Sequence, residues 1–372
     1  MKIPFYRADI GVTEKDYIVD LLNSKSVNCV EELESVFESY TGASFALATS
    51  HGTSALHLAM LALDLKRGDK VLCCVNAFPS IPEVVRHFDA EPIFIDIDED
   101  SFNIDLNKLE EYLVANNSKK LKAVIVSHVA GQMVDLERLY KMAEDNNVKV
   151  IEDATDALGC DYNGSKIGST GADITCFSFN PHLKKGISNG GMLVSDNEEI
   201  IERAKLLRNH GLSIDEEGPE YLYNIIDIGT NYTMSQLDAA YILAQLEKQD
   251  KFISRQKEIA KKYNSALEGV DHITLPQENE NHSYSLYIIK IDKNRDSFAK
   301  EMQEKGIVTG VHYIPLHLMS YYKTKYALRI NDYPVALRNY SQILSIPIYP
   351  SLSDKEIDYI CNTIKDIAKN RV

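Results

Sequence analysis

The sequence predicts an α/β fold with a mostly parallel central sheet and a smaller C-terminal α+β domain. In the first two thirds of the chain, strand-like runs alternate with amphipathic helical runs, which is typical of a parallel sheet covered by helices. The strand-like runs carry Val and Ile at both alternating positions, as expected for strands buried on both faces. The expected strands are 70–75, 91–98, 121–129, 148–154, 173–179 and 191–196, and the expected helices between them are 54–65, 82–88, 106–114 and 136–146.

The last third of the chain has a different pattern. From about residue 254, Lys/Glu-rich segments with helical periodicity flank one short strand-like run, 285–291. These helical segments are 252–267, 295–306 and 354–369. We therefore predict a large α/β domain over residues 1–250 and a small α+β domain over residues 251–372.

Composition excludes several classes of partner. The chain has 40 Lys+Arg against 55 Asp+Glu, a formal net charge of −15, which argues against nucleic acid or an anionic membrane as the main partner. No stretch approaches the roughly 20 apolar residues that a membrane span needs, and the N-terminus lacks the apolar run of a signal peptide. The six cysteines show no CxxC spacing, so we expect reduced thiols rather than disulfides or a metal site. These features predict a cytoplasmic protein.

Ligands of such sheets bind beyond the carboxyl ends of the strands, where two short segments stand out. Residues 50–54, Ser-His-Gly-Thr-Ser, lead into an apolar helix and offer N–H groups and hydroxyls to a phosphate, or they simply cap the helix. Glu152 and Asp153 end a strand. A carboxylate there could bind a metal, act as a base, pair with a protonated ring nitrogen or cap the next turn.

A third segment, residues 177–191, connects two expected strands and combines a serine, two lysines and a Gly-Gly pair. A lysine in a ligand crevice can form a Schiff base with a cofactor. The alternative is that Lys184 and Lys185 are solvated loop charges.

Taken together, these and further motifs cover nearly the whole chain. They are IPF (3–5), GTSAL (52–56), AF (77–78), SHVAGQ (127–132), EDA (152–154), FSF (177–179) followed by lysines, GG (190–191), RNHG (208–211), NYTMSQLDAA (231–240), VHYIPLH (311–317) and LSIP (344–347). This set resembles the fold-type-I pyridoxal-phosphate enzymes and, more narrowly, the DegT family of nucleotide-sugar aminotransferases.

The resemblance implies a role for several residues in binding the cofactor, pyridoxal 5'-phosphate or its amino form. Thr53, Ser54 and Ser178 are expected to hold the phosphate, and Phe78 to lie on the pyridine ring. Asp153 is expected to pair with the ring nitrogen and keep it protonated.

The resemblance also implies a homodimer with shared active sites. In this arrangement Asn231 is expected to reach the cofactor phosphate of the neighbouring subunit.

Three positions depart from the family pattern. Asp156 stands where a glutamine or histidine is usual, near the ring hydroxyl of the cofactor, and two carboxylates so close should raise the pKa of one of them. Thr233 stands where an arginine is common. The expected lysine position, four residues after Phe179, is a leucine in this chain.

The displaced lysine leaves two hypotheses. In one, a bulge in the loop brings Lys184 to the cofactor, with Lys185 as a weaker candidate. In the other, no lysine binds the cofactor and His182 acts as base, as in related keto-sugar 3-dehydratases. We favour Lys184, because a primary amine both anchors the cofactor and shuttles the proton.

The segment 311–317 supplies candidate substrate residues. His312, Tyr313 and His317 are expected to line a sugar-nucleotide pocket, although both histidines fit hydrogen-bonded structural roles equally well. No cluster of His, Cys, Asp or Glu has metal-ligand spacing, so no metal is expected.

The function predicted is the transfer of an amino group, from glutamate, to a keto group of a nucleotide-linked deoxysugar in cell-surface glycan or amino-sugar biosynthesis. Two alternatives remain open at this point. One is a keto-sugar 3-dehydratase or other lysine-free enzyme, and the other is a non-catalytic protein that binds the cofactor or the sugar nucleotide.

Overall fold

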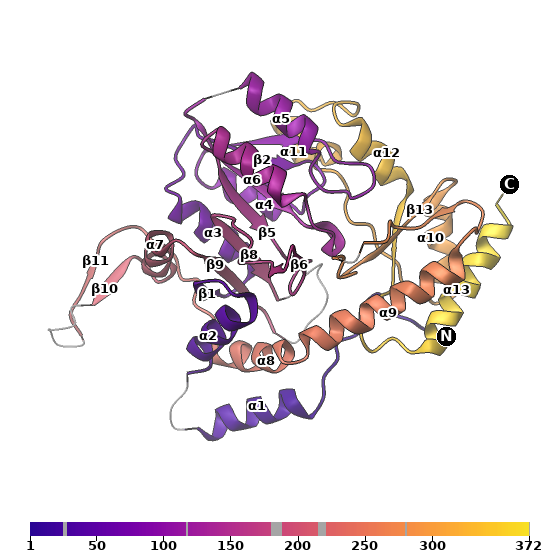
Figure 1. Cartoon of the computed structure of the whole chain (residues 1–372), viewed down its shortest axis with the longest axis horizontal. Helices are drawn as coiled ribbons and strands as arrows, with labels where there is room; N and C mark the ends of the chain where they lie inside the picture. The colour runs from indigo at the N-terminus through magenta and orange to yellow at the C-terminus, as the bar shows by residue number, and fades with distance from the viewer. Residues whose placement is uncertain (25–27, 117, 180–187, 215–220, 280, 372) are drawn as a thin grey trace.

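The computed structural model describes residues 1–24, 28–116, 118–179, 188–214, 221–279 and 281–371, and a seven-stranded sheet lies at its centre (Figure 1). The strands are β1 (Phe45–Thr49), β2 (Lys70–Cys74), β3 (Glu91–Ile95), β4 (Leu121–Ser127), β5 (Lys149–Asp153), β6 (Asp161–Tyr162), β7 (Ser165–Lys166), β8 (Ile174–Ser178), β9 (Gly191–Ser195), β10 (Leu212–Ile214), β11 (Tyr223–Ile225), β12 (Ile273–Thr274), β13 (Tyr287–Ile291) and β14 (Ile343–Ile346). The helices are α1 (Val12–Asn23), α2 (Cys29–Thr41), α3 (Gly52–Ala62), α4 (Ser80–Arg86), α5 (Leu106–Ala115), α6 (Leu136–Asp145), α7 (Glu198–Arg208), α8 (Gln236–Leu246), α9 (Gln249–Leu267), α10 (Arg295–Glu304), α11 (Ser320–Lys325), α12 (Pro334–Gln342) and α13 (Asp354–Lys369), with short 3-10 turns η1 (Val129–Gly131) and η3 (Leu316–Leu318).

The central sheet has the strand order β1-β9-β8-β5-β4-β2-β3. The pairs β2–β3, β2–β4, β4–β5 and β5–β8 are parallel, whereas β9 runs antiparallel to both β8 and β1. The predicted mostly parallel sheet is thus confirmed. The parallel pairs need crossover connections, which helices α4, α5 and α6 provide between β2 and β5.

The described residues form three clusters of buried side chains, of which two are large. The larger one covers both faces of the central sheet, where Val71, Ile125 and Ile151 are fully buried. The smaller one lies among α9, α10, α13 and the sheet β12-β13-β14, and it includes Ile3 from the N-terminus. Residue 250 falls in the first turn of α9, and the domain boundary drawn there stays a prediction.

Strand β1 is the main addition to the predicted sheet. Its sequence, Phe-Ala-Leu-Ala-Thr, contains two alanines, which are depleted in strands. The sequence pattern therefore does not predict this strand. The structure pairs it with β9 over five residues, from Phe45 opposite Ser195 to Thr49 opposite Gly191. This pairing places the start of α3 beside the end of β8.

All six cysteines are free thiols, and five of them are buried. Within the described part of the chain, no helix has both the length and the apolar character needed to cross a bilayer.

The hairpin of β10 and β11 projects from the body of the molecule, at the left of Figure 1. Several of its apolar side chains are exposed, including Tyr221 at 77% and Ile228, just beyond β11, at 85%. Helices α8 and α9 run end to end below the sheet toward the C-terminal elements.

Candidate functional site

A polar cradle forms where β8 and β1 end and β9 begins, beside the N-terminus of α3. The register places Ser178 opposite Gly191, and Gly191 opposite Thr49. A Cβ on Gly191 would lie 2.4 Å from the His51 carbonyl oxygen, and a Cβ on Gly52 would lie 2.5 Å from the Ser178 Cβ. Only glycine at both positions allows this close approach of the backbone.

The cradle offers donors suited to a phosphate. The N-cap residue of α3, His51, makes no side-chain capping hydrogen bond, so no cap side chain occupies the N–H groups of the first turn. The buried Ser54 hydroxyl lies 3.1 Å from the hydroxyl of Ser50, and Ser178 flanks them from β8. N–H groups at a helix N-terminus, hydroxyls and the helix dipole together favour an anion. Thr53, the other predicted phosphate residue, is exposed in the same turn.

Asp153 lies at the carboxyl end of β5, next to Ser127 of β4 in the parallel register. Its carboxylate accepts hydrogen bonds from the Thr155 hydroxyl at 2.5 Å, from the Thr155 N–H at 3.2 Å and from the Ser127 hydroxyl at 3.4 Å. Burial raises the pKa of Asp153, the Thr155 hydrogen bonds oppose that rise, and the nearby Asp156 charge adds to it. The predicted coupling of the two carboxylates is present, but burial is the larger cause.

No described lysine or arginine forms an ion pair with Asp153. A buried carboxylate is stabilised by a cation, and a protonated pyridine nitrogen would provide one. The residues present therefore fit pyridoxal phosphate at both of its charged ends, with the cradle for the phosphate and Asp153 for the ring nitrogen.

Asp156, which is 8% exposed, follows Asp153 by one turn. Its carboxylate accepts the Ala130 N–H at 3.1 Å, and its carbonyl oxygen accepts the Ser283 hydroxyl at 3.2 Å. Gly131 makes this contact possible, since it has a φ of +80° and a Cβ there would lie 1.8 Å from the Ser283 hydroxyl oxygen. The C-terminal third of the chain thereby reaches the candidate site.

Phe78 is 38% exposed, and its ring makes an edge-on contact with Tyr313 at 6.1 Å between centroids. The Tyr313 N–H donates to the Asn76 side chain at 3.2 Å. Burial raises the pKa of the Tyr313 phenol, and the charges of Asp156 and Asp153 raise it further. Tyr313 and Phe78 therefore lie together near the two carboxylates, as a ligand-binding role for both requires.

The two predicted substrate histidines are buried and pack against other aromatic rings of the protein. The buried His312 ring stacks on Phe5 at 5.4 Å, and its Nδ1 lies 2.8 Å from the Ser345 hydroxyl. His317 is 0% exposed, its ring packs 5.1 Å from that of Tyr333, and burial lowers its pKa. Neither placement decides between the two alternatives, so the substrate roles of His312 and His317 stay predictions.

Asn231 is exposed beside the cradle. Its side-chain oxygen accepts a hydrogen bond from the Thr233 hydroxyl at 2.9 Å, and the neighbouring Tyr232 carbonyl accepts the Ser50 N–H at 2.8 Å. Its expected contact with a second subunit stays a prediction. Lys184, Lys185 and His182 lie outside the described residues, so the choice of catalytic base also stays a prediction.

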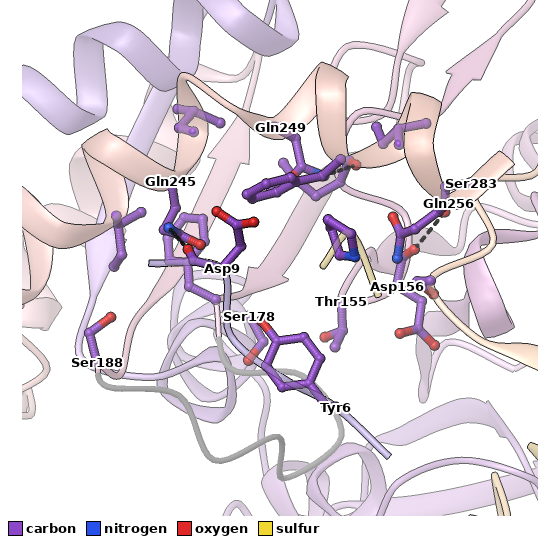
Figure 2. A pocket seen from close by; sticks show the side chains of 18 of the residues that line it. Tyr6, Asp9, Thr155, Asp156, Ser178, Ser188, Gln245, Gln249, Gln256 and Ser283 are labelled. Atoms are coloured by element: carbon purple, nitrogen blue, oxygen red, sulfur yellow. Dashed lines mark hydrogen bonds between the residues drawn. The ribbon is translucent and has the colours of Figure 1, made fainter. Parts of the chain in front are cut away.

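A cavity of about 180 Å³ adjoins this group of residues (Figure 2). It shares Thr155, Asp156 and Ser178 with the candidate site, and its other walls come from the N-terminal segment and from α8 and α9. Sequence reasoning missed most of these residues. Thr155 was recognisable, because the residue two positions after an aspartate often donates its N–H to that side chain. Tyr6, Asp9 and the glutamines of α8 and α9 carry no local signal, since only the fold brings them here.

Comparison with known proteins agrees with this geometry. Residues 9–365 match the DegT/DnrJ/EryC1/StrS aminotransferase family. The chain belongs to this family. The fold type, the aminotransferase class and the cofactor predicted for the family from the sequence are thereby confirmed.

Individual relatives match over almost the full length. The chain is 32% identical to the spore coat polysaccharide biosynthesis protein SpsC of Bacillus subtilis, over 99% of this chain and 97% of that protein. It is 29% identical to the GDP-perosamine synthase of Escherichia coli O157:H7, over 99% of both chains. Among solved structures, the putative sugar aminotransferase Spr1654 of Streptococcus pneumoniae in its PMP form superposes with a TM-score of 0.92, at 28% identity and 99% coverage of both chains. The same relative is also known in a PLP form.

Proposed function

We propose that this chain transfers an amino group from glutamate to a keto group of a nucleotide-linked deoxysugar, in cell-surface glycan or amino-sugar biosynthesis. The observation that carries the proposal is the presence of the α3 cradle together with Asp153, a half-buried carboxylate that forms no ion pair with a described lysine or arginine. The names of its relatives, a GDP-perosamine synthase and a putative sugar aminotransferase, support the substrate class.

Bound in this site, pyridoxal phosphate would act as the electron sink for the reaction. The α3 N–H groups and the hydroxyls of Ser54 and Ser178 would hold its phosphate. Asp153 would keep a proton on the ring nitrogen, and Phe78 would cover one face of the ring. Lys184 would take the proton from the substrate carbon and return it, as a positioned primary amine can.

The proposed active unit is a homodimer that works in the cytoplasm. Exposed apolar residues on and beside the β10–β11 hairpin, such as Tyr221, Ile226 and Ile228, support an interface with a second copy of the chain. Asn231 follows this hairpin and would contribute to the partner's cofactor site. The free state of the six cysteines agrees with a reducing compartment.

The first test asks whether a lysine binds the cofactor. Protein purified with added pyridoxal phosphate is expected to absorb at about 410–430 nm, and borohydride is expected to fix the cofactor to Lys184. Lys184→Ala should abolish both signals, and Lys185→Ala serves as the matched control. Absence of the band, together with no label on either lysine, would overturn the proposal.

The second test measures turnover on keto-deoxysugars linked to GDP, UDP and dTDP, with glutamate as donor. Amino-sugar formation by the unmodified protein and its loss in Lys184→Ala are expected. Conversion of the keto-sugar without formation of an amino sugar, lost in His182→Ala and retained in Lys184→Ala, would instead establish the lysine-free dehydratase. Cofactor binding without conversion of any of the three sugars would indicate a binding protein. The family match favours neither alternative.

A further inference from the structure

Thr155 lies between the Asp153 carboxylate and the cavity. It is the second residue after β5, and the turn that follows the strand brings both its N–H and its hydroxyl onto the carboxylate of Asp153. The same residue is half-buried in the cavity wall, beside Asp156 in Figure 2. Neither the predicted cofactor residues nor the proposed proton transfer includes Thr155.

The two oxygens of the Asp153 carboxylate are held differently. Oδ1 accepts the Thr155 hydroxyl at 2.5 Å and the Thr155 N–H at 3.2 Å. From the described residues, Oδ2 accepts only the Ser127 hydroxyl, at 3.4 Å. A carboxylate oxygen has room for about two hydrogen bonds. Oδ1 is therefore filled by Thr155, and Oδ2 is the oxygen that can accept from a further donor.

The two Thr155 donors favour the ionised carboxylate. The backbone N–H can only donate, and the hydroxyl contact of 2.5 Å falls in the range of about 2.5–2.7 Å that is typical of a hydroxyl donating to a charged oxygen. Such charge-assisted hydrogen bonds are roughly twice as strong as neutral ones. Burial raises the pKa of Asp153, and the hydrogen bonds from Thr155 lower it.

Other titratable groups also act on this carboxylate, from its own turn and from the elements packed against it. These groups are Asp156, His128, Cys176 and Tyr313. After burial and the Thr155 hydrogen bonds, the Asp156 charge raises the pKa of Asp153 further and a charge on His128 lowers it. Burial chiefly, and nearby carboxylate charge in addition, raise the pKa of the Cys176 thiol and the Tyr313 phenol, so both stay uncharged at neutral pH. The Thr155 hydroxyl is the largest of the causes that lower the pKa of Asp153.

We propose that Thr155 is a positioning residue: its hydroxyl keeps the Asp153 carboxylate ionised and fixed through Oδ1, and thereby leaves Oδ2 to accept the protonated ring nitrogen of the cofactor. Thr155 acts through Asp153 and touches no reacting atom. This inference rests on the proposed function, because the charge on Asp153 has this use only when pyridoxal phosphate or its amino form is bound. An acceptor that is ionised and fixed in the empty site lowers the cost of ordering it when the cofactor binds.

The test compares two probes that differ at one ring position. They are pyridoxamine 5'-phosphate, which forms no covalent bond to a lysine, and its analogue in which CH replaces the ring nitrogen. Binding of both to the cofactor-free protein is measured by calorimetry. Thr155→Val removes the hydroxyl, keeps the N–H and is close in size, and Thr155→Ser is the matched control that keeps the hydroxyl. Thr155→Val is expected to weaken pyridoxamine phosphate about three- to tenfold and to leave the affinity for the analogue unchanged, whereas Thr155→Ser should change neither.

A second readout needs no cofactor. In carbon NMR spectra of cofactor-free protein labelled at the aspartate carboxyl carbons, Asp153→Asn identifies the Asp153 resonance. Because the hydroxyl favours the ionised form, Thr155→Val should raise the pKa of Asp153, and Thr155→Ser should leave that pKa unchanged. Far-UV circular dichroism confirms that both variants are folded.

Equal losses of affinity for the two probes in Thr155→Val would show that Thr155 only shapes the site, and this would overturn the inference. Unchanged affinity for both probes would overturn it as well, as would an unchanged pKa of Asp153 in Thr155→Val. Equal affinity of the unmodified protein for the two probes, or binding of neither, would instead overturn the part that the proposed function gives to Asp153.

Discussion

The contact between Gly52 and Ser178 yields a quantitative prediction for the cradle. A Cβ at residue 52 would lie 2.5 Å from the Ser178 Cβ and 2.9 Å from its hydroxyl oxygen. Carbon atoms in contact normally lie about 3.5–4.0 Å apart, so the Cβ that Gly52→Ala adds would lie about 1 Å too close to the Ser178 Cβ. Overpacking of this kind costs about 1–3 kcal/mol, whereas alanine is favoured over glycine within a helix by about 0.5–1 kcal/mol. The two ranges differ by about 0–2.5 kcal/mol, and the overlap of about 1 Å with a strand residue places the expected net loss in the free energy of unfolding at about 1–2 kcal/mol.

A second variant shows whether Ser178 causes this loss. Ser178→Gly removes both side-chain atoms, and the nearest remaining atom is the Cα of residue 178, at 3.1 Å. Adding Gly52→Ala to Ser178→Gly is therefore expected to change stability by less than about 0.5 kcal/mol, so that the two substitutions are strongly non-additive.

The assay is urea unfolding of the cofactor-free protein, followed by far-UV circular dichroism, for the two single variants and the double variant. Cofactor retention after gel filtration is measured in parallel, and Gly52→Ala should lower it because the cradle becomes narrower. A Gly52→Ala protein as stable as the unmodified one would refute this account of the packing. If Gly52→Ala lowers the free energy of unfolding equally in the unmodified protein and in the Ser178→Gly variant, Ser178 is not the cause of the loss.

Three further predictions concern charge and assembly. Burial raises the pKa of Asp153 above its unfolded value, so the folded state binds the proton more tightly and the stability of the cofactor-free protein should fall as pH rises through that pKa. Asp153→Asn should remove this fall in urea titrations between pH 4 and 8, while it weakens cofactor retention; an unchanged pH profile would contradict the role of burial. Burial lowers the pKa of His57 to about 4, so its contribution to stability is complete above pH 6.5 and is lost as pH falls toward 4. His57→Phe, which can keep the stacking on Phe88, should flatten the stability profile over that range, and a profile as steep as that of the unmodified protein would argue against His57 as its source. Ile228→Asp should convert the proposed dimer to a folded monomer in analytical ultracentrifugation, because the residue is 85% exposed in one subunit; an unchanged sedimentation coefficient would place the interface elsewhere.

The local sequence pattern determined most of the central sheet, and the motifs that resemble the DegT family implied the cofactor. The strands that end at Asp153 and Ser178 are buried on both faces, so their apolar composition identifies them without reference to the rest of the fold. The glycine and hydroxyl residues at the start of α3 fit either a phosphate site or a simple helix cap by their local chemistry, and the phosphate role that the resemblance implies for them stays a prediction.

Only the tertiary structure decided which residues meet. The short, alanine-rich strand β1 is defined by its pairing with β9. The register of that pairing brings Gly52 into contact with Ser178. Gly131 and Ser283 are far apart along the chain and meet because a Cβ is absent from one of them. Contacts between distant segments depend on strand register and helix placement, and no local pattern of residue types encodes these.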